Sequence, residues 1–141
     1  LPDLRKFVTL SPIPGLGAWL RERAEGGDSA AASVLETAPP RDEAAQTALR
    51  RLAALYLLEV KDRCDRPRDP VARFHLNNGA LVHDIHARAD LSDRGIAQSC
   101  GAMVNYLYDL DQVEANHESF ASQGRIAATR SVRQLARAAQ E

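Results

Sequence analysis

The spacing of apolar residues predicts a long helix in the middle of the chain. Between about residues 42 and 62, apolar side chains recur at steps of three and four, which places them on one stripe of a helix: Ala45, Ala48, Leu49, Leu52, Leu55 and Tyr56. Asp42 and Glu43 stand in its first turn, where the helix dipole favours negative charge. Leu57 and Leu58 widen the stripe, so we expect a central helix that is covered on more than one side.

Weaker patterns predict four more helices, over about residues 15–24, 28–37, 92–108 and 125–139. Asp28 or Ser29 is a suitable N-cap for the second of these, and two prolines follow its end. Ser92 is a suitable N-cap for the third, which carries one apolar stripe: Ile96, Cys100, Met103 and Leu107. Residues 109–124 are polar, and we expect a loop there.

Strands are predicted at two places, and a third strand is possible. Residues 7–10 are aromatic and β-branched, and we expect this strand to give way to a tight loop because Pro12 and Pro14 follow. The turn Asn77-Asn78-Gly79 precedes a second strand over residues 80–86. Many helices with two or three widely separated strands favour an α/β or α+β fold over a helix bundle. So few strands form an incomplete sheet, and the chain starts with Leu1, so we expect upstream sequence to be absent.

Composition describes an ordinary globular domain of 141 residues, with 45% hydrophobic and 26% charged side chains. The formal net charge of -1 gives no overall field that attracts nucleic acid or an anionic membrane, and we expect neither as a partner. Two cysteines, Cys64 and Cys100, are too few for a disulfide framework and indicate a reducing compartment. Function must therefore be sought in local groups of side chains.

Among the four histidines, His75 is the most interesting. It lies between Phe74 and Leu76 just before the turn, where it is either a structural histidine or a catalytic one. His83 and His86 are three residues apart on the expected strand, which places them on opposite faces and argues against a metal site. His117 falls in the expected polar loop and is interpreted as a surface residue.

Ser11 follows the first strand and precedes a stiff proline loop. Ligands bind at strand ends in α/β sheets, so Ser11 is a candidate site residue, although a serine that bonds its own turn fits the same pattern. The sequence contains no nucleophile-elbow motif, no Walker loop and no dinucleotide fingerprint.

Three ordered blocks resemble the C-terminal part of malonyl-CoA decarboxylase. They are Ser11-Pro12-Ile13-Pro14-Gly15, then Phe74-His75-Leu76-Asn77-Asn78-Gly79-Ala80, then Ala89-Asp90-Leu91-Ser92 with Gly95, Ser99, Gly101, Met103 and Asn105-Tyr106-Leu107-Tyr108. The resemblance spans about residues 7–109. Animal members carry a Trp-Arg-Ile-Asn-Trp run where this sequence reads His83-Asp84-Ile85-His86-Ala87, which indicates a bacterial branch.

The resemblance implies an α/β catalytic domain similar to the GNAT acetyltransferase fold, and the conversion of malonyl-CoA to acetyl-CoA and carbon dioxide. It implies no cofactor and no metal. It places the catalytic serine at Ser11, the catalytic histidine at His75 and a supporting tyrosine at Tyr108, which we expect at the end of the helix over residues 92–108. Ser11 and His75 would also bind the substrate. A CoA-binding segment and a helical oligomerisation domain would lie upstream of residues 1–141, in a cytoplasmic homo-oligomer.

Two other functions fit the sequence. A GNAT-like acyltransferase would use an acyl-CoA but move the acyl group to an amine. A non-catalytic helical interaction module would use the central helix of residues 42–62 and the basic final helix, whose arginines could also face an acidic partner.

Overall fold

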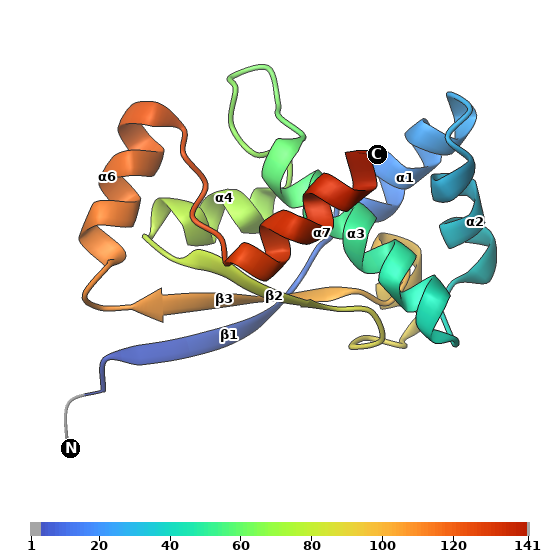
Figure 1. Ribbon diagram of the computed structural model, residues 1–141, viewed down its shortest axis with the longest axis horizontal. Helices are drawn as coiled ribbons and strands as arrows, with labels where there is room; N and C mark the ends of the chain where they lie inside the picture. Colours follow the sequence, from blue (N-terminus) through green and yellow to red (C-terminus); the bar gives the residue numbers. More distant parts are fainter. Residues whose placement is uncertain (1–3, 141) are drawn as a thin grey trace.

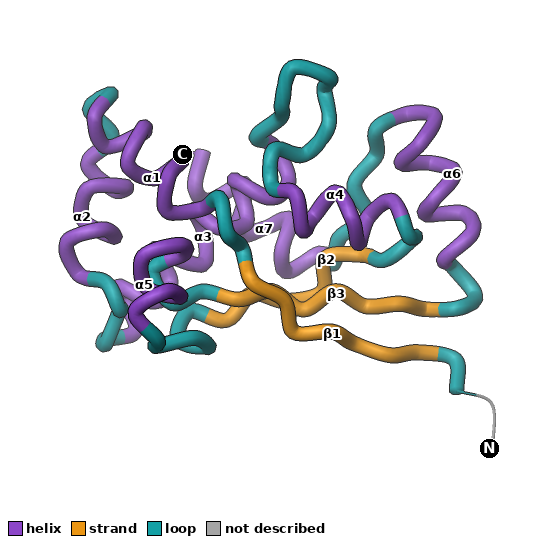
Figure 2. Tube along the Cα trace, turned by 180° about the vertical axis from the view of Figure 1, so that it is seen from behind, coloured by secondary structure: helices purple, strands orange, loops and turns teal. Residues whose placement is uncertain are grey.

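The sheet has three strands, and its central strand comes last in sequence. The computed structural model describes residues 4–140, and within this range the strands are β1 (Lys6–Pro12), β2 (Leu81–His86) and β3 (Met103–Asp109). Their order is β1-β3-β2, and both neighbouring pairs are antiparallel. Figure 1 shows helices gathered above the sheet, and α5 is best seen from behind in Figure 2. The predicted α/β class is confirmed.

Seven helices accompany the sheet in the described range. They are α1 (Leu16–Glu25), α2 (Ser29–Thr37), α3 (Glu43–Glu59), α4 (Pro70–Asn77), α5 (Asp93–Ser99), α6 (Val113–Gln123) and α7 (Arg130–Gln140). The helices α3 and α7 pack against each other and against β2, and α4 lies beside β2 as well. None of the described helices is both long and apolar enough to cross a membrane.

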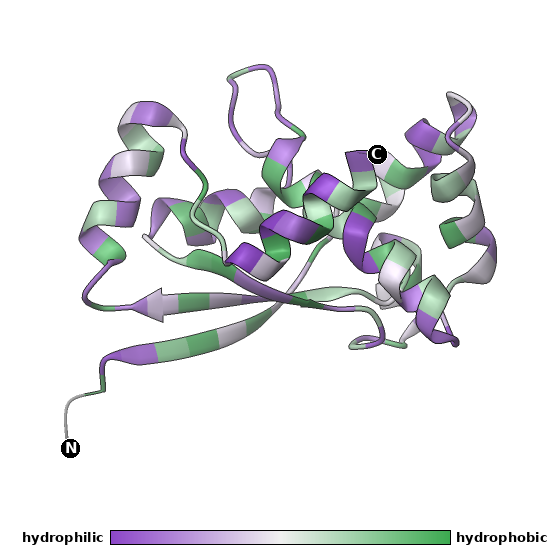
Figure 3. Cartoon of the chain, viewed as in Figure 1, coloured by the Kyte–Doolittle hydropathy of each residue, from purple (hydrophilic) through white to green (hydrophobic). Residues whose placement is uncertain are grey.

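The central helix of the sequence prediction is α3. Asp42 is its N-cap, and the backbone N–H of Ala45 donates to the Asp42 carboxylate at 2.7 Å. Every residue from Leu52 to Leu58 is buried, so the helix is covered on more than one side, as predicted. Hydropathy alternates along α7, as expected of a helix that buries one side against α3 (Figure 3).

The predicted helix over residues 92–108 is wrong in its second half. Ser92 does cap a helix, but this helix is α5 and ends at Ser99. Cys100 and Gly101 follow in the left-handed region, with φ values of 58° and 94°, which stops the helix. From Met103 the chain is the strand β3, in which the alternate residues Val104 and Tyr106 are buried. Tyr108 therefore lies on a strand.

Several boundaries also differ from the prediction. The strand β1 continues through Ser11 to Pro12, because Pro12 lies at the end of an edge strand. The polar stretch after Asp109 contains α6, whose Phe120 is buried, so His117 lies on a helix. The final helix α7 begins at Arg130, because residues just before it run beside β2: Val82 N–H donates to Ala127 O, and Thr129 N–H donates to Val82 O.

Candidate active site

The register of the sheet places Ser11 and Tyr108 on the same face. Ser11 pairs with Val104, Thr9 with Tyr106, and Phe7 with Tyr108. Directly opposed residues of an antiparallel pair point to the same side, and side chains two residues apart on one strand share a face. These six side chains thus form two adjacent rows. Val104 and Tyr106 are fully buried within the rows, which identifies this face as the one beneath the helices.

The short helix α4 brings His75 to this face. Its start is well defined, because Asp69 is the N-cap and Pro70 occupies the first turn. One turn further on, His75 stacks on the ring of Tyr106, with 4.3 Å between ring centroids and 18° between ring planes. The sequence prediction did not assign a helix here. Two residues of β3 thus contact the imidazole, since Tyr106 lies against its face and Tyr108 at its edge.

Both ring nitrogens of His75 have hydrogen-bond partners. Nε2 lies 3.1 Å from Oγ of Ser11, and Nδ1 lies 2.6 Å from the hydroxyl of Tyr108. Ser11 Oγ is in turn 3.1 Å from Oγ1 of Thr9. The three site residues expected from the resemblance are therefore in direct contact, although they come from β1, α4 and β3. In the neutral imidazole, one nitrogen donates and the other accepts, so the two hydrogen bonds fix each other's direction.

The site is mostly closed to solvent. Ser11 is 6% exposed and His75 is 9% exposed. Burial lowers the pKa of His75 below its ordinary value of 6.5, which favours the neutral ring near pH 7. Burial raises the pKa of Tyr108, and contact with the side chain of Asn78 partly offsets this effect, so its hydroxyl stays protonated. A neutral imidazole between two hydroxyl groups can accept a proton at one ring nitrogen while it donates a proton from the other.

Sequence reasoning missed Asp69, the N-cap of α4, the helix that carries His75. Its carboxylate is 1% exposed, and each oxygen accepts one backbone hydrogen bond: Oδ1 from Gly15 N–H at 3.3 Å, Oδ2 from Ala72 N–H at 3.0 Å. Burial raises the pKa of Asp69. The signal in the sequence was the pair Asp69-Pro70, which is typical of a helix start.

Tyr106 is the second residue that sequence reasoning missed. Its ring is fully buried under His75, and its hydroxyl is the one buried side-chain oxygen within residues 4–140 that has no hydrogen-bond partner. Burial and the nearby Asp69 raise the pKa of Tyr106 well above its ordinary value. The contact between Tyr106 and His75 is thus made by the two ring faces and not by the Tyr106 hydroxyl.

The other histidines lie away from the site. A β-bulge between Val82 and Asp84 lets both Val82 and Ile85 point into the core. His83 and His86 are both exposed, so the expected opposite placement of these two rings is wrong. His117 is exposed, as predicted. Across residues 4–140, no group of three His, Cys, Asp or Glu side chains is arranged to hold a metal ion.

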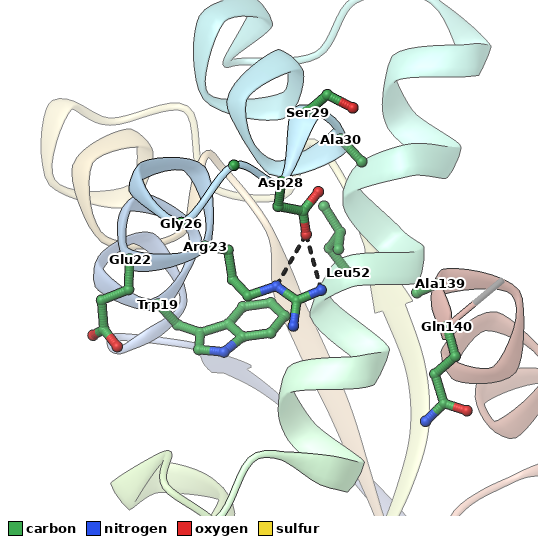
Figure 4. Close-up of a pocket in the computed structure, with 11 residues that line it drawn as sticks. Trp19, Glu22, Arg23, Gly26, Asp28, Ser29, Ala30, Leu52, Ala139 and Gln140 are labelled. Carbon is green, nitrogen blue, oxygen red and sulfur yellow. Dashed lines mark hydrogen bonds and ion pairs between the residues drawn. The ribbon is translucent and has the colours of Figure 1, made fainter.

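A separate cleft lies between α1, α2, α3 and the end of α7 (Figure 4). Arg23 spans it: the guanidinium lies over the ring of Trp19 at 5.3 Å and pairs with the Asp28 carboxylate at 2.9 Å. Neither Ser11 nor His75 lines this cleft. Each charged side chain of the cleft already has an ion-pair partner, because Arg23 pairs with Asp28 and Glu22 pairs with Arg68 outside the cleft, and we assign no chemistry to it.

Comparison with known proteins identifies relatives along the whole chain. The family model described as "Malonyl-CoA decarboxylase C-terminal domain" matches residues 1–141. The mitochondrial malonyl-CoA decarboxylase of Anser anser anser is 34% identical over 94% of this chain and 32% of its own length. That of Rattus norvegicus is also 34% identical, over 95% of this chain and 33% of its own length. The chain thus spans about a third of the length of the curated relatives it matches.

Solved structures show the same fold. Malonyl-CoA decarboxylase from Rhodopseudomonas palustris matches with a TM-score of 0.86 and 42% identity, over 96% of this chain and 34% of the other. The protein of the same name from Cupriavidus metallidurans matches with a TM-score of 0.81 and 36% identity, over 95% and 39%. The GNAT-like α/β domain that the resemblance implied is confirmed.

Proposed function

Because this chain belongs to the malonyl-CoA decarboxylase family, we propose that it carries the Ser11 and His75 side chains that decarboxylate malonyl-CoA. The observation that carries the proposal is the 3.1 Å contact between Ser11 Oγ and His75 Nε2. This contact joins residues 64 positions apart in sequence, on two different elements. A serine that only bonded its own turn would not make this contact, whereas Ser11 bonds both its strand neighbour Thr9 and the distant His75.

Decarboxylation of a malonyl thioester breaks the bond between C2 and the carboxylate carbon. Carbon dioxide leaves, and the electron pair of that bond moves into the thioester carbonyl to give an enolate. A proton added to C2 then completes acetyl-CoA. The site must therefore stabilise negative charge on the thioester oxygen and supply one proton, and a positioned donor at such an oxygen contributes about 3–4 kcal/mol.

The Ser11–His75 pair matches both tasks. We assign His75 Nε2 to the proton transfer, either directly or through the Ser11 hydroxyl, because Nδ1 is already bonded to Tyr108. A neutral ring that gave up its Nε2 proton alone would become an imidazolate, so Nδ1 takes the Tyr108 hydroxyl proton in the same step, and solvent then returns one proton to the His75–Tyr108 pair. Ser11 hydrogen-bonds the substrate carboxylate or thioester oxygen and aligns the breaking bond with the carbonyl π system. Tyr108 orients the imidazole.

The curated relatives are about three times as long as this chain. We infer that the working protein is a longer, cytoplasmic homo-oligomer with CoA-binding and helical oligomerisation segments in addition to these 141 residues. The support is that the chain covers about a third of each relative. Gel filtration with light scattering on the full-length protein tests the oligomer, and a monomer would contradict it.

The function is best tested in a chimera, because the R. palustris protein then supplies the segments that these 141 residues do not contain. The matching third of the R. palustris protein is exchanged for this chain, and acetyl-CoA formed from malonyl-CoA is followed by chromatography. Ser11→Ala and His75→Ala are made in the chimera. Ser33→Ala and His83→Ala are the matched controls, because both side chains are exposed. The unmodified R. palustris protein serves as the assay reference.

We expect the chimera to form acetyl-CoA and each site variant to lose about a hundredfold or more of that rate, while both controls keep it. A folded chimera without turnover, beside an active reference, would contradict the proposed function. Full activity of the Ser11→Ala or His75→Ala chimera would contradict the role of that residue. Acetyl transfer to amines without loss of malonyl-CoA would identify an acyltransferase instead.

A further inference from the structure

The buried carboxylate of Asp69 joins the two segments that carry the Ser11–His75 pair. Gly15 N–H, in the turn four residues after Ser11, donates to Oδ1. Ala72 N–H, one helical turn before His75, donates to Oδ2. The two donors are 57 residues apart in sequence and have no other common acceptor among the hydrogen bonds of the described residues.

A helix cap alone needs only one of these bonds. Asp42 and Asp28 cap α3 and α2 with one side-chain oxygen, and the N–H that each caps belongs to its own helix. Asp69 caps α4 in the same way, but its second oxygen reaches the turn between β1 and α1. Asp42 is exposed, whereas Asp69 is 1% exposed. Water therefore does not compete for the two backbone N–H groups that donate to Asp69.

Asp69 makes no direct contact of its own with the Ser11–His75 hydrogen bond. Asp69 has no hydrogen bond to Ser11 or to His75, whose partners are each other, Thr9 and Tyr108. Its bonds instead set the distance between the turn after β1 and the first turn of α4. The Ser11–His75 hydrogen bond spans the same two segments, and a small displacement of one segment would lengthen it.

We propose that Asp69 is a positioning residue, whose two backbone hydrogen bonds hold β1 and α4 at the separation that the Ser11–His75 pair requires. This inference rests on the proposed function for its kinetic consequence, but the positioning itself is independent of the reaction. Loss of the bridge should therefore slow the chemical step and leave substrate binding nearly unchanged, because the pair acts on bonds that change in the transition state.

Substitution of Asp69 by serine distinguishes the hydrogen bond to Gly15 N–H, which joins the two segments, from the hydrogen bond to Ala72 N–H, which caps α4. Asp69→Ser keeps an N-cap hydroxyl for Ala72 N–H, since serine caps helices as well as aspartate, but its shorter side chain has no second oxygen for Gly15 N–H. Asp69→Ala removes both bonds. Asp42→Ser is the matched control, because it makes the same exchange at a cap that binds one helix only.

Two measurements on the full-length protein test the proposal. The first is kcat and KM for malonyl-CoA. The second is the pKa of His75 from nuclear magnetic resonance with ring-15N histidine, assigned through loss of the signal in His75→Gln. The second measurement does not depend on turnover, so an inactive wild-type protein would count against the proposed function and not against the bridge.

For Asp69→Ser we expect kcat to fall about tenfold or more with KM within about threefold, since displacement of reacting groups by an ångström has effects of this size. We also expect the pKa of His75 to move up towards its ordinary value as the site loosens. Asp42→Ser should leave both unchanged. If Asp69→Ala does not fold, the serine variant still decides. Wild-type kcat and an unchanged His75 pKa in Asp69→Ser would reduce Asp69 to a helix cap and overturn the proposal.

Discussion

Tyr108 and Ser11 bind opposite nitrogens of the His75 ring. The Tyr108 hydroxyl is 2.6 Å from Nδ1, and Ser11 Oγ is 3.1 Å from Nε2. If Tyr108 donates to Nδ1, then Nε2 carries the proton and donates to Ser11. If Nδ1–H donates to Tyr108, then Nε2 accepts the Ser11 proton. Tyr108 therefore selects whether His75 faces the serine as an acid or as a base.

Tyr108→Phe removes this selection and keeps the ring. Phe7 stacks on Tyr108 at 4.8 Å between centroids, and a phenylalanine keeps that packing. We expect kcat for malonyl-CoA to fall about tenfold to a hundredfold, because the change leaves Nδ1 of His75 without its partner, and an unsatisfied buried polar atom costs about 1–3 kcal/mol. Steady-state kinetics measures the change. The control is Phe7→Leu, which alters the packing and leaves the hydroxyl; an equal loss in both variants would mean that packing alone matters.

The pH profile should show an acid limb set by His75. Burial lowers its pKa below 6.5, so the folded protein keeps the ring neutral to a lower pH than the unfolded chain does. The contribution of His75 to the free energy of unfolding is therefore fully present above pH 6.5 and is lost as the pH falls through the lower folded pKa. If the neutral ring is the working form, kcat/KM is constant near pH 7 and falls along the same limb.

Two measurements check this prediction. The pH dependence of kcat/KM gives the limb of the free enzyme, and urea unfolding at several pH values gives the free energy of unfolding. Wild type should lose unfolding free energy as the pH falls from 6.5 to the folded pKa of His75. His75→Gln has no imidazole to titrate, so this loss should be absent in the variant. An activity limb above pH 6.5 would contradict a lowered His75 pKa.

The resemblance predicted that Ser11 and His75 share a site, and their side chains are in contact, but the sequence could not give the element that holds Tyr108. Met103 and Leu107 are four residues apart, and this spacing fits one face of a helix and also one face of a strand. The strand was the right choice because Cys100 and Gly101 adopt left-handed backbone angles and end α5. A cysteine in that conformation has no clear signature in a sequence.

Asp69 and Tyr106 were missed for a different reason. Their roles depend on contacts between distant segments: Asp69 with Gly15 across 54 positions, and Tyr106 with His75 across two elements. Local patterns report the helix start at Asp69-Pro70 and the apolar character of β3, and no more. The capped helices α2 and α3 were predicted well because their signals lie within a few residues.

Tyr106 should act through its ring and not through its hydroxyl. The hydroxyl is buried without a partner, so Tyr106→Phe leaves the stack on His75 and removes an unsatisfied group. We expect unfolding free energy within about 1 kcal/mol of wild type, or higher, and unchanged kcat. Tyr106→Leu removes the aromatic surface and should cost about 2–4 kcal/mol and lower kcat. Urea unfolding and kinetics on both variants decide; a large loss of kcat in Tyr106→Phe would assign the hydroxyl a direct role.

Gly15 is required because Tyr56 lies against it. A Cβ at position 15 would come within 3.0 Å of the Tyr56 hydroxyl oxygen, and Tyr56 is 1% exposed and has little freedom to move. We expect Gly15→Ala to cost about 1–3 kcal/mol of unfolding free energy through overpacking. The same substitution should weaken the Asp69 bond to Gly15 N–H and so lower kcat.

Two further variants show whether the contact with Tyr56 is the cause. Gly26 ends the same helix α1, and a Cβ there meets its nearest atoms at 3.5 Å, an ordinary contact. Gly26→Ala should therefore stay within about 0.5 kcal/mol of wild type. In Gly15→Ala combined with Tyr56→Phe, the obstructing oxygen is gone, and most of the lost unfolding free energy should return in urea titrations. If the double variant is as unstable as the sum of the two single variants, the two positions are not coupled, and steric contact with Tyr56 does not explain the need for glycine.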